Sequence, residues 1–124
     1  KTKEAAATAA EYNWEPQQGV VLRLEDADVV PQVVQRGNVA EATIQYALLG
    51  TGAGTEVTET RVLRRGAEVV GTLSQKSYTR NDGTWVSSQQ FKIAPNLAPG
   101  TYTLVQTVQS ATQAINANTE FIVQ

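Results

Sequence analysis

Residues 99–109 constrain the fold more tightly than any other stretch of the chain. Pro99 and Gly100 form a turn signal, because proline presets φ at the first corner of a turn and glycine tolerates positive φ at the second. The residues that follow alternate with a period of two. One face takes Tyr102, Leu104, Gln106 and Val108, and the other takes Thr103, Val105, Thr107 and Gln109. This pattern predicts a β-strand with one buried face.

The same alternation recurs along the chain from Val20 onward, with turn signals between the segments. The predicted strands cover residues 20–25, 40–48, 55–63, 68–79, 84–93, 101–109 and 119–123, with an edge segment at 32–34. In the first of them the acidic run 26–28 is expected to end the strand, and residues 68–79 form one long strand or two short ones kinked near Gly71. The sequence therefore predicts an all-β chain of seven or eight strands.

Residues 97–102, with Leu97 before the turn and Tyr102 after it, resemble a corner found in immunoglobulin-like (Ig-like) and fibronectin-type-III-like domains of bacterial envelope proteins. In that corner the tyrosine ring caps the core and its hydroxyl bonds back to the backbone. The resemblance implies an Ig-like antiparallel β-sandwich over residues 19–124 and an extracytoplasmic location. The chain has no cysteine pair of the antibody type, which favours bacterial modules over vertebrate-type domains.

The missing residue types exclude most catalytic and metal chemistry. The chain of 124 residues has no cysteine and no histidine, so zinc, haem and Ser-His-Asp or Cys-His sites are not expected. A formal net charge of −2 argues against nucleic acid as a partner. No apolar run is long enough to span a membrane, although an anchor preceding Lys1 is compatible with the sequence. We therefore expect no cofactor, no metal and no enzyme activity.

Residues 1–18 differ in composition from the rest and are predicted to form an N-terminal arm, helical or extended. The alanine-rich part favours a helix that Pro16 ends. Three interpretations remain open: a linker, an arm that docks on another subunit, and an arm folded back on its own domain. In the second interpretation Tyr12 and Trp14 are the predicted partner-binding anchors.

The charged residues favour structural roles over chemistry. Glu25, Asp26 and Asp28 cluster at a strand end without the glycine-spaced loop of a calcium site. Glu41, Glu56, Glu59 and Glu68 are predicted to face solvent, so no pair of carboxylates converges on a cleft. Arg61, Arg64 and Arg65 are predicted to form exposed ion pairs with Glu59 and Glu68. The face of residues 55–63 stays ambiguous, because Val57 and Leu63 share a parity with Glu59 and Arg61.

Two functions remain open from the sequence. The first is a non-catalytic structural or protein-interaction module of a bacterial envelope or extracellular protein: a spacer, an adhesive unit or a self-assembling subunit. Its partners are proteins, including other copies of the chain. The alternative is a carbohydrate-binding module that stacks surface glycans on exposed aromatics. Tyr46, Tyr102 and Trp85 are predicted to be core residues by their parity, which leaves Tyr78 and Trp14 for a sugar.

Overall fold

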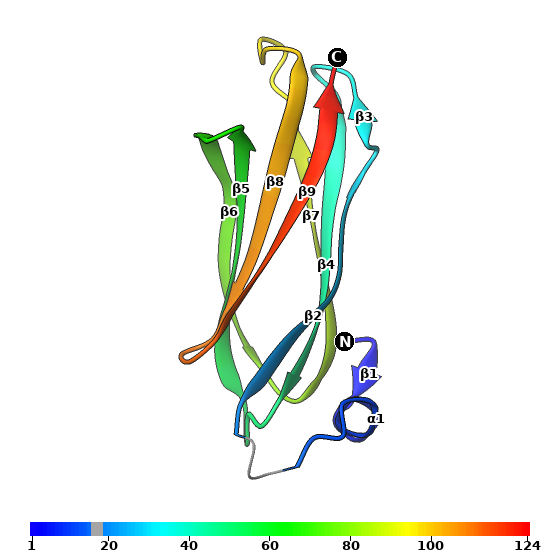
Figure 1. The fold of residues 1–124 in the computed structure, drawn as a ribbon, viewed down its shortest axis with the longest axis vertical. Helices are drawn as coiled ribbons and strands as arrows, with labels where there is room; N and C mark the ends of the chain where they lie inside the picture. Colours follow the sequence, from blue (N-terminus) through cyan, green and yellow to red (C-terminus); the bar gives the residue numbers. More distant parts are fainter. Residues whose placement is uncertain (16–18) are drawn as a thin grey trace.

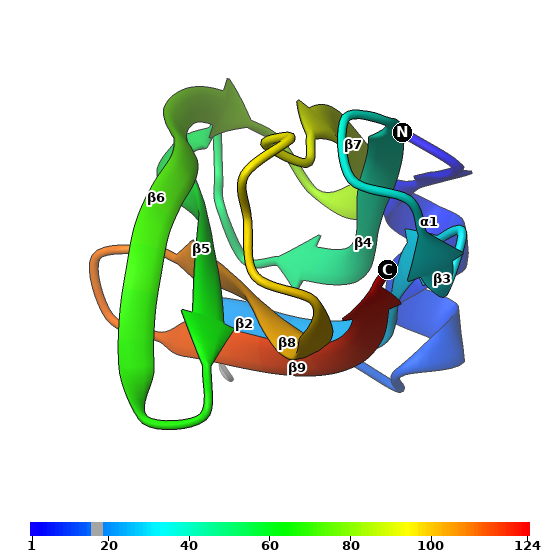
Figure 2. The same ribbon diagram turned by 90° about the horizontal axis from the view of Figure 1, so that it is seen from above.

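The computed structural model describes residues 1–15 and 19–124, which form two β-sheets packed face to face (Figures 1 and 2). One sheet has the strand order β1 (Lys3–Glu4), β7 (Gly83–Lys92), β4 (Val39–Leu49), β2 (Val21–Val30). The other has the order β3 (Val33–Val34), β9 (Ala114–Val123), β8 (Gly100–Gln109), β5 (Thr55–Arg65), β6 (Glu68–Arg80). The predicted all-β sandwich is confirmed. The edge segment predicted at 32–34 is the two-residue strand β3, and the two-residue strand β1 adds to the predicted set.

All paired strands are antiparallel except β3 and β9, which run parallel. The alternation of β4 produces the core as predicted. Its inward side chains are at most 1% exposed: Ala40, Ala42, Ile44, Tyr46 and Leu48. A shift of one residue in its pairing would turn this row to solvent, so the buried face fixes the register.

The predicted corner at Tyr102 is present. The Tyr102 hydroxyl donates to the carbonyl oxygen of Ala98 at 2.5 Å, and its ring stacks on Phe121 with centroids 6.1 Å apart. Gly100 has φ +143°, and a Cβ at this position would lie 2.9 Å from Nη2 of Arg65. The corner therefore favours glycine for its backbone conformation, while the Arg65 side chain beside it could shift to make room.

Three strand boundaries differ from the prediction. β2 continues through the acidic residues 26–28 to Val30, with a register shift between Leu24 and Asp26. β2 is an edge strand, so the acidic side chains reach solvent without breaking the pairing. β9 begins at Ala114, ahead of the predicted residue 119. β6 is one strand whose pairing with β5 shifts register near Gly71.

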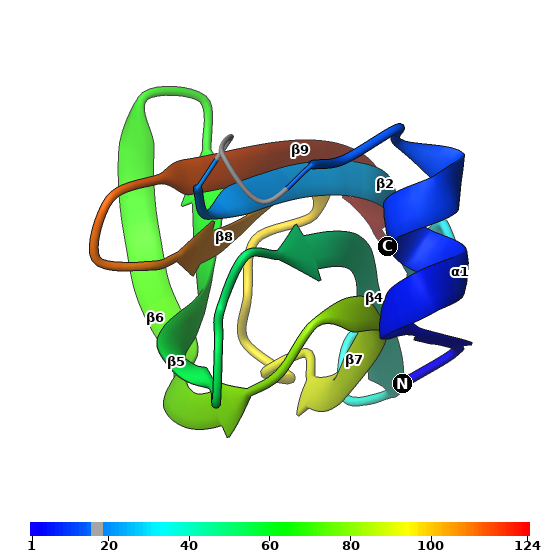
Figure 3. The same ribbon diagram turned by 90° about the horizontal axis from the view of Figure 1, so that it is seen from below.

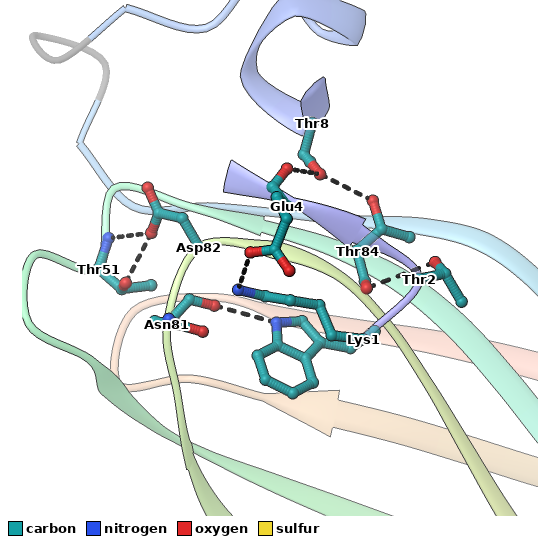
Figure 4. A network of polar contacts seen from close by, with 9 residues as sticks. Lys1, Thr2, Glu4, Thr8, Thr51, Asn81, Asp82 and Thr84 are labelled. Atoms are coloured by element: carbon teal, nitrogen blue, oxygen red, sulfur yellow. Dashed lines mark hydrogen bonds and ion pairs between the residues drawn. The ribbon is translucent and has the colours of Figure 1, made fainter. Parts of the chain in front are cut away.

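The N-terminal arm lies on its own domain. β1 extends the four-stranded sheet beside Gly83 and Thr84, and α1 (Ala5–Glu11) packs against the outer face of β7 and β4 (Figures 3 and 4). Thr8 and Thr84 are fully buried, with their hydroxyl oxygens 3.0 Å apart. On β4, which α1 contacts, the outward-pointing Ala47 and Leu49 are also fully buried. The arm therefore completes the fold in cis, as in the third interpretation of the sequence.

Candidate functional site

A set of polar and charged side chains gathers inside the sandwich, in a polar layer between two apolar clusters. The polar layer consists of Tyr46, Glu59, Arg61, Arg80, Ser87 and Gln106, contributed by β4, β5, β6, β7 and β8. Glu59, Arg61 and Gln106 are at most 3% exposed. The layer separates the cluster around Leu104 and Phe121 from the cluster around Ile44 and Val57.

Glu59 is the centre of the polar layer. Its carboxylate accepts hydrogen bonds from the Tyr46 hydroxyl at 2.6 Å, from Nη2 of Arg80 at 3.3 Å and from the Ser87 hydroxyl. Burial raises the pKa of Tyr46 far above its ordinary value, and the hydrogen bond to Glu59 and the charge of Glu59 act in the same direction. Tyr46 is therefore a permanent donor to the carboxylate.

Arg61 forms the second half of the layer. Its Nε donates to Oε1 of Gln106 at 2.9 Å, and its Nη2 donates to the carbonyl oxygen of Ser87 at 3.0 Å. Gln106 donates in turn to the carbonyl oxygen of Thr43 at 2.9 Å. Burial lowers the pKa of Arg61, and the negative charge of Glu59 opposes that shift. These bonds tie the two sheets together by polar contacts, in a chain that has no cysteine for a disulfide.

The prediction that Glu59 and Arg61 face solvent is wrong. The strand alternation of β5 runs without interruption, so both side chains point inward with Val57 and Leu63. The shared parity noted in the sequence was the signal for this burial. Arg64 and Arg65 also depart from the predicted ion pairs with Glu68, since they donate to the carbonyl oxygens of Ala67 and Pro99.

The prediction of solvent exposure is confirmed for the other three carboxylates, Glu41, Glu56 and Glu68. Within the described part of the chain, no three His, Cys, Asp or Glu side chains gather where they could hold a metal ion. In the acidic cluster of β2, Glu25 accepts from Gln45 at 2.7 Å and Asp28 accepts from the Val29 amide at 2.8 Å. These carboxylates therefore serve as local hydrogen-bond acceptors.

Two shallow surface hollows lie away from the polar layer. One, of about 210 Å³, is lined by residues of β5 and of the turn after β8, among them Thr55 and Ser110. The other, of about 270 Å³, lies over Val33, Thr101 and Ile122. No residue of the polar layer lines either hollow. A substrate in these hollows would not reach Glu59 or Arg61.

The predicted core tyrosines Tyr46 and Tyr102 are buried, whereas Trp85 is only half-buried. Trp85 lies at a seam, which we define as the side of the sandwich where β6 and the part of β7 beyond its pairing with β1 form the edges of the two sheets. The guanidinium of Arg80 lies 4.4 Å from the ring centroid of Tyr78 and 4.3 Å from that of Trp85. Farther along the seam, Lys76 donates to Gln89 at 2.9 Å.

The structure places both predicted partner-binding residues in contacts within the chain. The Tyr12 hydroxyl donates to Oε2 of Glu25 at 2.5 Å, and Nε1 of Trp14 donates to the carbonyl oxygen of Gly19 at 3.1 Å. Both side chains are half-buried. The Tyr12 contact joins the arm to β2, and binding of another molecule by Tyr12 and Trp14 stays a prediction.

The bond between Tyr12 and Glu25 predicts a pH dependence at alkaline pH. Burial raises the pKa of Tyr12 from 10.0 to about 12, with further contributions from the hydrogen bond to Glu25 and its charge. The pKa of Tyr12 is higher in the folded than in the unfolded chain. The contribution of this hydrogen bond to the free energy of unfolding is therefore complete below pH 10 and is lost as the pH rises through about 12. We expect the stability difference between the protein and Tyr12→Phe to narrow over that interval in chemical denaturation. A difference that stays constant up to pH 12 would contradict this assignment.

Comparison with known proteins adds a fold relationship. No family model and no curated protein sequence matches the chain. Among solved structures, the CARDB domain of a Pyrococcus furiosus protein, crystallised with di-metal ions, is 14% identical with a TM-score of 0.58. The match covers 85% of this chain and 87% of that domain.

Parts of two enzymes are also similar. A β-glucosidase from Erythrobacter marinus is 8% identical with a TM-score of 0.61, and the match covers 85% of this chain but 16% of that one. The DNA glycosylase AlkC from Pseudomonas fluorescens is 12% identical with a TM-score of 0.56, with 83% and 30% covered. The chain thus spans about a sixth of the glucosidase it matches. At these identities the likeness shows the fold alone: the chain is a β-sandwich domain of the Ig-like type.

Proposed function

We propose that this chain is a non-catalytic Ig-like module of a bacterial cell-envelope or extracellular protein, acting as a structural spacer and protein-interaction unit. One observation carries the proposal. A carboxylate and a guanidinium at neighbouring inward positions of β5, Glu59 and Arg61, are buried and held in hydrogen bonds that join the two sheets. They therefore stabilise the sandwich and are not accessible to a substrate.

The shape of the domain supports a role as a spacer. The C-terminus lies at one end of the long axis, and the N-terminus lies in the opposite half of the molecule (Figure 1). The likeness to the CARDB domain covers nearly all of both chains, which supports a self-contained module. Among the described residues no helix is both long enough and apolar enough to cross a membrane.

The aromatic residues favour protein interaction over the carbohydrate-binding alternative. Tyr46 and Tyr102 are at most 1% exposed. Tyr78 and Trp85 are half-buried, and both rings contact the guanidinium of Arg80. A sugar platform needs coplanar ring faces open to solvent, and the contacts with Arg80 compete for those faces.

Accessibility of the module in its bacterial host tests the extracytoplasmic part of the proposal. A short epitope inserted at Gly52, a loop position with open space around it, would be probed with an antibody. We expect labelling on intact cells, or after the outer membrane alone is permeabilised, while a cytoplasmic marker protein stays unlabelled. Labelling that requires rupture of the cytoplasmic membrane would contradict the proposal.

A further inference from the structure

The edge of β7 is paired over only a short part of its length. β1 contacts Gly83 and Thr84, and the amide of Thr2 donates to the carbonyl oxygen of Thr84 at 2.7 Å. In the described part of the chain, no strand pairs with residues 85–92 on that side. Because backbone groups alternate in direction along a strand, those of Val86, Ser88 and Gln90 point to the same open side as Thr84. The pairing with β1 shows that this edge can accept another strand.

The other sheet edges are less suited to accept a strand. β6 shifts register twice against β5 and carries Lys76 in the middle of its length, both of which discourage edge pairing. β2 lies against β9, and its Leu22 amide donates to Oε1 of Gln113 at 2.8 Å. In contrast, β7 pairs with β4 in unbroken register, and residues 84–91 carry neither a charge nor a proline.

The charges beside this edge are mainly positive. Lys76 reaches across the seam to Gln89, and Lys92 ends the strand. Lys1 lies 5.2 Å from the ring centroid of Trp85 and pairs with Glu4. Of the carboxylates near residues 85–92, Glu59 is held in the polar layer and Glu41 lies one strand away, on β4. An acidic side chain on an incoming strand, placed opposite Gln89, would lie near Lys76. This pair of opposite charges would strengthen the binding of the strand.

We propose that the open edge of β7 binds an extended acidic segment of a partner protein, which adds to the four-stranded sheet antiparallel to β7 in the register begun by β1. The inference rests on the proposed role as a protein-interaction module and names its surface and the chemistry of its partner. A second copy fits less well. Two β7 edges related by a two-fold axis at Gln89 would bring the Lys76 side chains of both copies together.

Because β1 already pairs with β7, a test segment can be added before Lys1 as an extension of the same chain. The segment then has the high effective concentration of a tethered ligand. Lys3 pairs with Thr84, so the third residue added before Lys1 would lie opposite Gln89. The extension Thr-Glu-Thr-Glu-Thr-Glu before Lys1 places its acidic side chains on the inner side of the sheet. The matched extension Thr-Lys-Thr-Lys-Thr-Lys differs only in charge.

Amide hydrogen exchange measured by NMR on the full chain reports the pairing. We expect the acidic extension to slow exchange at Val86, Ser88 and Gln90 by at least about tenfold, and the basic extension to have a smaller effect. With Lys76→Glu, the acidic extension should protect these amides from exchange about threefold less well. The basic extension should protect them better than it does in the unsubstituted chain. Arg36→Glu, a matched charge reversal at an exposed turn outside the seam, should change neither.

Three outcomes would overturn the inference. If neither extension slows exchange, the edge does not accept a strand. If both slow it equally, the acidic identity of the partner is wrong. If the chain without an extension becomes protected at these amides as its concentration rises, the occupant is a second copy. None of these outcomes bears on the cellular location, so the proposed function is tested separately by the epitope at Gly52.

Discussion

Replacing Glu59 with alanine is expected to lower the free energy of unfolding by about 3–5 kcal/mol, the range found when one partner of a buried charge network is removed. The truncation leaves the Tyr46 hydroxyl and the Arg80 guanidinium without their acceptor. It also leaves the buried Arg61 without the opposing charge of Glu59. Urea denaturation followed by tryptophan fluorescence would measure the change.

Two further variants separate the role of the carboxylate from a general effect of mutating β5. Glu56→Ala removes a carboxylate from the same strand at an exposed position, and it should change the free energy of unfolding by less than about 0.5 kcal/mol. Glu59→Gln keeps the shape but replaces one acceptor oxygen with a donor, so its effect should lie between the two. A loss below about 1 kcal/mol for Glu59→Ala would show that the network contributes little.

Removal of residues 1–18 is expected to destabilise the sandwich by about 2 kcal/mol and to lower Tm by roughly 6–12 °C. The truncation exposes Ala47 and Leu49 and removes the hydroxyl partner of Thr84. It also uncovers the backbone of Gly83 and Thr84, which β1 pairs in the full chain. Differential scanning calorimetry of the full chain and of a chain that starts at Gly19 would measure the loss.

Single substitutions in α1 control for the length change. Thr8→Val removes the hydroxyl that contacts Thr84 while keeping the volume, and should reproduce about 1 kcal/mol of the loss. Ala6→Ser, at an exposed position of the same helix, should have little effect. Equal stability of the full and truncated chains would mean that the arm contributes nothing to the fold.

The sequence predicts the sandwich well because its signals are local. The alternation in β4 and the corner at Tyr102 each depend on residues within a few positions of one another. The strand ends were less predictable. Whether the acidic residues 26–28 break β2 depends on its place at a sheet edge, which is a property of the assembled sheet.

The sequence does not predict the polar layer, because the charged residue types of β5 favour an exposed position while their place in the strand alternation favours an inward one. Glu59 and Arg61 occupy inward positions of an uninterrupted strand, and their burial is tolerated only because β4, β7 and β8 bring Tyr46, Ser87 and Gln106 to the same place. These partners are distant in sequence, so no local sequence pattern predicts them. The docking of the arm on Thr84 is likewise a long-range contact.

Solution mass, measured by light scattering for the full chain and for the chain that starts at Gly19, tests the central claim that the arm completes its own domain. The account predicts a monomeric full chain, because the arm occupies its site in cis. It predicts that the truncated chain associates as concentration rises, because an apolar surface and a strand edge are uncovered. A full chain that is oligomeric and becomes monomeric on truncation would contradict the account, and would make the arm, with Tyr12 and Trp14, a device for joining copies.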